Sequence, residues 1–107
     1  MVLSRTKEFE LAAPVSTDEL KARGEKTFLH IGSLVAFEGV IVGHIKGVIQ
    51  AEGGSIAFST TRTDAVDITT LSGWDKLGSV SKFSMTVNIM SMVNENISDE
   101  DIFGLMA

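Results

Sequence analysis

Apolar and polar residues alternate in the first part of the chain. In the segment that follows, apolar residues recur at steps of three or four. Residues 7–13 alternate, which predicts a half-exposed strand that ends at Pro14. Ser16, with Glu19 three residues later, has the spacing of a helix N-cap. We therefore expect an amphipathic helix from there to about Ala36. Its apolar stripe consists of Leu20, Gly24, Phe28, Ile31, Leu34 and Val35.

Four more strands are predicted after this helix. Their expected ranges are 40–52, 55–61, 65–70 and 80–93. Gly53 and Gly54 suit a two-residue hairpin turn, because glycine tolerates the positive φ that such turns require. A turn of that kind would place Gly47 opposite Thr60 on the apolar face of the hairpin.

The C-terminal residues predict a second, short helix. Ser98 precedes three acidic residues, 99–101, which favour a helix N-terminus, and apolar residues follow them. The order strand, helix, four strands, helix predicts one α+β domain over residues 1–107, in which a helix packs on an antiparallel sheet. Consecutive strands are expected to be neighbours, with the first strand at an edge or beside the last.

Composition and charge narrow the function classes. The chain has 107 residues, no cysteine and a formal net charge of -5. The lack of cysteine excludes disulfides, cysteine-zinc sites and thiol nucleophiles. The acidic balance argues against nucleic acid and anionic membranes as partners. The N-terminus has no apolar segment typical of a secretory signal, so we expect a cytoplasmic protein.

Two glycines and two polar residues of the strand at 40–52 are the candidates for a ligand site. Gly43 and Gly47 are expected to face the long helix, where missing side chains leave either a groove for that helix or a pocket for a small ligand. His44 and Lys46 lie on the other side of the same strand. They could move a proton or hold an anion, although such residues are more often ordinary surface residues.

The sequence identifies no catalytic residue and no cofactor. It contains two histidines, so a structural zinc site would need carboxylates, and these have no recognisable spacing. Hydroxyl residues are frequent in the predicted strands, but none lies in a glycine-x-serine-x-glycine turn. We therefore expect no metal site, and whether the chain is an enzyme stays open.

The face of the predicted sheet that points away from the long helix is not purely polar. Its apolar residues include Val42, Val48, Met90 and Met92, and the mean hydropathy of the chain is +0.24. A monomer would leave such residues in water unless the C-terminal helix covered them. The favoured hypothesis is a non-catalytic interaction or accessory module that forms a homo-oligomer or binds another protein. The alternative is a small-ligand binder or enzyme with a pocket between helix and sheet.

Overall fold

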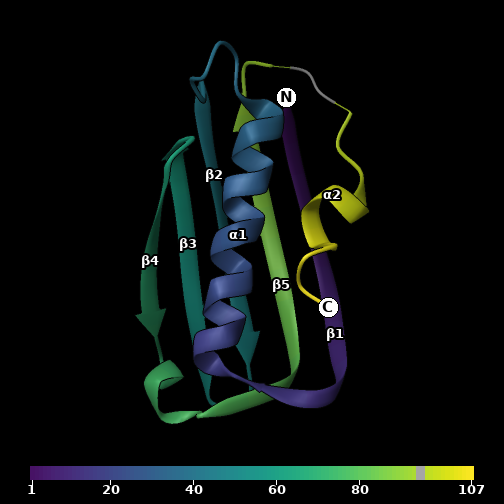
Figure 1. Cartoon of the computed structure of the whole chain (residues 1–107), viewed down its shortest axis with the longest axis vertical. Helices are drawn as coiled ribbons and strands as arrows, with labels where there is room; N and C mark the ends of the chain where they lie inside the picture. The colour runs from purple at the N-terminus through teal and green to yellow at the C-terminus, as the bar shows by residue number, and fades with distance from the viewer. Residues whose placement is uncertain (94–95) are drawn as a thin grey trace.

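A computed structural model of the chain describes residues 1–93 and 96–107. It is an α+β fold in the predicted order, with one five-stranded antiparallel sheet and helices on one side of it (Figure 1). The elements are β1 (Val2–Ser16), α1 (Thr17–Val35), β2 (Gly43–Ala51), β3 (Gly54–Arg62), β4 (Ala65–Leu71), the 3-10 helix η1 (Trp74–Lys76), β5 (Ser79–Ser91) and α2 (Asp99–Phe103).

The strand order in the sheet is β1-β5-β2-β3-β4. Strands β2, β3 and β4 form the expected meander, but β5 does not continue it beside β4. Instead, β5 inserts between β1 and β2 and pairs with both. Hydrophobic burial explains this position: every second residue of β5 from Phe83 to Ile89 is buried, whereas β4 has no fully buried residue. An interior position in the sheet therefore goes to the more apolar strand, β5, and an edge position to β4.

The hairpin of β2 and β3 differs from the prediction by two residues in register. Gly47 lies opposite Phe58, not opposite Thr60, because the turn consists of Glu52 and Gly53. Gly54 belongs to β3, where a Cβ would come within 2.8 Å of the backbone of Trp74. A shift of two residues keeps each side chain on its predicted face.

Strand β1 is longer than predicted and runs through Pro14 to the start of α1. Proline is tolerated there because β1 is an edge strand and its pairing with β5 is irregular between Glu10 and Val15. The predicted cap is present: the backbone N–H of Glu19 donates to the Ser16 hydroxyl at 3.0 Å. The helix begins and ends within one residue of its predicted range.

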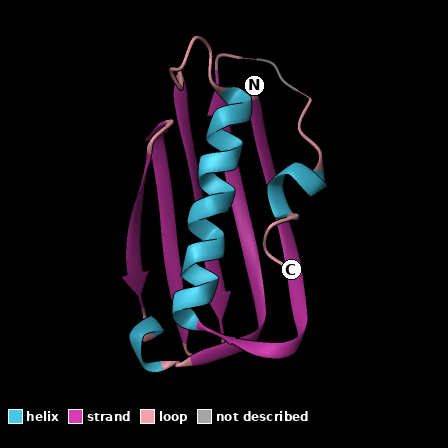
Figure 2. Cartoon of the chain, in the orientation of Figure 1, coloured by secondary structure: helices cyan, strands magenta, loops and turns pink. Residues whose placement is uncertain are grey.

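Both helices lie on the same side of the sheet (Figure 2). Helix α2 packs there through Phe103, whose ring centroid is 5.9 Å from that of Phe9 in β1. The hydroxyl of Thr27 in α1 donates to the sulfur of Met106 just beyond α2 at 3.4 Å. The C-terminal helix therefore completes the core and does not cover the opposite face of the sheet.

In the ranges 1–93 and 96–107, no helix has the length and apolarity needed to cross a membrane.

Candidate functional site

The space above Gly47, one of the expected pocket positions, is occupied by the long helix. A Cβ on Gly47 would lie 2.7 Å from the ring of Phe28 in α1. This ring stacks on that of Phe58, with centroids 5.2 Å apart. The missing side chain of Gly47 therefore makes room for Phe28, as in the groove interpretation.

The four pocket candidates do not all meet in one site, although Lys46 and Gly47 both line one hollow of about 370 Å³. Gly43 has a φ of +140°, and a Cβ there would overlap the carbonyl oxygen of Met90, so this glycine allows close approach to β5. His44 and Lys46 point to the opposite face, where they lie beside Met90 and Asn88. Side chains of β2 thus alternate between a filled core and an open face.

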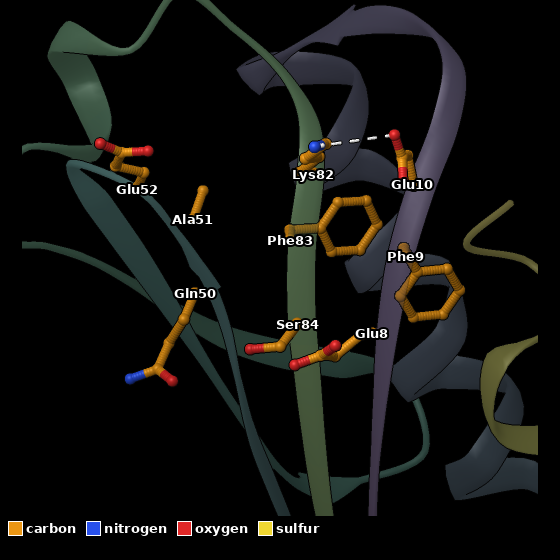
Figure 3. A pocket seen from close by; sticks show the side chains of 9 residues that line it. All are labelled: Glu8, Phe9, Glu10, Gln50, Ala51, Glu52, Lys82, Phe83 and Ser84. Atoms are coloured by element: carbon orange, nitrogen blue, oxygen red, sulfur yellow. Dashed lines mark ion pairs between the residues drawn. The ribbon is translucent and has the colours of Figure 1, made fainter.

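A hollow of about 580 Å³ lies on this open face where β1, β5 and β2 run side by side (Figure 3). Lys82 and Glu10 form an ion pair across it, with Nζ and Oε1 3.7 Å apart. The remaining lining residues are Glu8, Phe9, Gln50, Ala51, Glu52, Phe83 and Ser84.

The aromatic rings near this hollow belong to the core. Phe9 and Phe83 stack with centroids 4.8 Å apart, and Phe9 also contacts α2 on the helix-covered side. The walls are mostly exposed polar side chains, which solvent can screen. We therefore regard the hollow as an open surface depression of mixed polarity, unlike the concave and mostly apolar form of typical small-molecule sites.

A different feature gathers most of the exposed apolar side chains. In the described ranges, eight large hydrophobic residues are exposed, and six of them lie at one end of the sheet. This end contains the start of β1, the end of β5, the start of β2 and the loop after α1 (Figure 1). We name these six residues the end patch: Val2, Phe37, Val40, Val42, Met90 and Met92.

Contacts within the end patch make it continuous. Val2 is the register partner of Met90, and the backbone N–H of Met92 donates to the carbonyl of Val42 at 2.9 Å. Phe37, Val42 and Met92 line one hollow of about 390 Å³ together with Val93. Three of the four predicted interface residues therefore belong to one surface.

A tight turn fixes the position of Phe37. The backbone groups of Phe37 and Val40 exchange two hydrogen bonds, of 2.8 and 3.0 Å. The two residues between them, Glu38 and Gly39, have φ values of 51° and 80°, as in two-residue hairpin turns. A positive φ at a glutamate is unfavourable, so these hydrogen bonds hold Glu38 in a strained conformation beside the exposed patch.

Val48, the fourth predicted interface residue, lies apart from the end patch. It is half-buried at the centre of the open face, between Thr86 of β5 and Ala57 of β3. Lys46, Asp67 and Asn88 line a hollow of about 370 Å³ together with it.

Phe37 and Val2 were not among the predicted interface residues. The only sequence signal for Phe37 is its position directly before Glu38 and Gly39, where a helix of the predicted length ends. Val2 lies before the alternation that defined the first strand, so the sequence pattern did not place it in the sheet. Both were missed because they lie outside the periodic stretches from which the strands and the helix were predicted.

No three histidine or acidic side chains within residues 1–93 and 96–107 come close enough to hold a metal ion. The chain matches no protein-family model, and neither the curated proteins nor the solved structures contain a detectable relative.

Proposed function

We propose that this protein is a non-catalytic interaction module that acts as a homo-oligomer and associates through the end patch. The observation that carries the proposal is the collection of six exposed apolar side chains on one continuous surface. Isolated exposed apolar residues are ordinary, but a contiguous set marks an interaction surface.

The composition of the patch supports a second copy as its occupant. Its side chains are aliphatic or aromatic, and two copies related by a two-fold axis would bring apolar groups against apolar groups. Full burial of one valine, methionine or phenylalanine side chain contributes about 1.5 to 3 kcal/mol. Several such side chains can offset the loss of translational and rotational freedom on association.

The proposal is tested by placing a carboxylate in the patch. Met90→Asp and Phe37→Asp should each break the contact at the end patch and lower the mass of the oligomer, because association there would then bury an unpaired charge. Light scattering coupled to size exclusion measures the mass of each variant. Leu105→Asp is the matched control: Leu105 is 48% exposed, as is Met90, but it lies beyond α2 and outside the end patch.

The variants also delimit the surface. If Val48→Asp dissociates the oligomer as well, the interface extends from the end patch across the open face. The proposal fails if Met90→Asp and Phe37→Asp keep the wild-type mass, or if Leu105→Asp lowers the mass to the same extent.

A further inference from the structure

The two edges of the sheet, β1 and β4, differ in how they are protected from pairing with another strand. An edge strand presents unpaired backbone N–H and C=O groups, and charges or proline commonly block them. Strand β1 contains Pro14 and carries Arg5 and Lys7 on its helix-covered face. Arg5 also forms an ion pair of 3.6 Å with Asp99 in α2.

Charge further discourages β1 from pairing with its own copy. In an antiparallel pair about a two-fold axis, opposing residues lie on the same face, so odd positions face odd ones and even positions face even ones. The two-fold axis of such a pair can lie at any residue from 5 to 9. At each of these positions, two like charges face each other across the two strands, either both basic (Arg5, Lys7) or both acidic (Glu8, Glu10). Like charges in directly opposing positions are destabilising.

Strand β4 has fewer of these protections. It contains no proline, its only charged residue is Asp67, and most of its other residues are β-branched. On its helix-covered face, Ile68 is half-buried and lines an open hollow of about 250 Å³ beside α1. The side of β4 away from β3 has no neighbouring strand among the described residues.

We propose that β4 pairs antiparallel with β4 of a second copy, about a two-fold axis at Ile68. This register overlaps all seven residues of the strand. It sets Ile68 against the same residue of the second copy, beside the hollow at α1. It also places each Asp67 opposite a neutral Thr69, so no like charges oppose each other. The two sheets then form one continuous sheet.

This surface is separate from the end patch, which lies at one end of β1, β5 and β2 (Figure 1). A chain with two different two-fold interfaces can form assemblies larger than a dimer. Loss of either interface should therefore reduce the assembly to a dimer held by the other.

Cysteine crosslinking tests the register directly, because the chain has no cysteine of its own. Ile68→Cys should give a disulfide-linked dimer under mild oxidation, since directly opposing residues have Cα atoms about 4.5 to 5.5 Å apart. Thr70→Cys is the control on the same strand and face. In the proposed register, the two Thr70 residues of the pair are offset by about 13 Å along the strands, too far for a disulfide. Equal and low crosslinking of both variants, on a non-reducing gel, would overturn the proposal.

A charge exchange gives a second readout that needs no thiol. Thr69→Asp would oppose each Asp67 with a carboxylate and should lower the mass measured by light scattering. Adding Asp67→Lys should restore the mass, because opposite charges then face each other. An unchanged mass for Thr69→Asp, or no restoration by the second change, would contradict β4 pairing.

Phe37→Asp should leave the Ile68→Cys crosslink intact, so failure of the end patch and failure of β4 pairing are distinguishable.

Discussion

Gly24 of α1 lies directly over the ring of Phe58 in β3, so close that a Cβ at position 24 would overlap the ring. We predict that Gly24→Ala lowers the free energy of unfolding by about 1 to 2 kcal/mol through overpacking, although alanine is the better helix former. Urea denaturation measures this difference.

Gly32 of the same helix is the matched control. A Cβ there would lie 3.2 Å from Cδ1 of Ile41, the far end of a flexible side chain. Gly32→Ala should therefore be neutral or stabilise by up to about 1 kcal/mol. Removing the Phe58 ring should also relieve the overpacking caused by Gly24→Ala. The double variant with Phe58→Leu should therefore lose less free energy of unfolding than the sum of the losses of the two single variants. Equal effects of the two alanine substitutions would contradict the packing.

The Ser16 cap predicts a loss of stability at the start of α1. Ser16→Ala removes the hydroxyl that accepts from the Glu19 N–H, and should lower the free energy of unfolding by about 0.5 to 2 kcal/mol. Ser16→Asp should retain most of the stability, since a carboxylate accepts the same hydrogen bond and favours a helix N-terminus. Thermal melts of both variants check the prediction, and an unchanged melting temperature for Ser16→Ala would contradict it.

Asp101 should make the docking of α2 sensitive to acid. Hydrogen bonds from the backbone N–H and then the hydroxyl of Ser98 lower the pKa of this carboxyl below its ordinary 3.8. Because the pKa is lower in the folded state, the ionised Asp101 carboxylate stabilises the fold at pH values above its ordinary pKa of 3.8. This stabilisation is lost as the pH falls through the lower pKa of the folded state. The melting-temperature difference between wild type and Asp101→Asn should therefore shrink in this acidic range. A difference that is constant with pH would contradict the account.

The turn after α1 should become more stable when its strain is relieved. Glu38 has a φ of 51°, a conformation that asparagine adopts more readily, and it precedes Gly39 as asparagine does in favoured hairpin turns. We predict that Glu38→Asn raises the free energy of unfolding by up to about 1 kcal/mol, measured from urea midpoints. A destabilised Glu38→Asn variant would show that the glutamate side chain is needed at this position.

The sequence predicted the elements of this fold better than their neighbours in the sheet. The stripe around Leu20 and Phe28 defined α1, because helical periodicity extends over many residues. The insertion of β5 between β1 and β2 could not be read from that pattern, since alternation gives the faces of a strand but not its partners.

The candidate sites show the same limit. Val42, Met90 and Met92 were found because they interrupt polar faces, but their meeting with Phe37 depends on the turn at Glu38. The role of Gly47 could not be settled from sequence, because a missing side chain can make room for a ligand or for a ring such as that of Phe28.

The mass of the wild-type protein in solution tests the central claim most directly. Light scattering behind size exclusion, over a series of micromolar protein concentrations, should give at least twice the chain mass of 11.5 kDa. Burial of the end patch against a second copy requires this result. A mass of 11.5 kDa at every concentration would contradict it, and both proposed interfaces between copies would then be wrong.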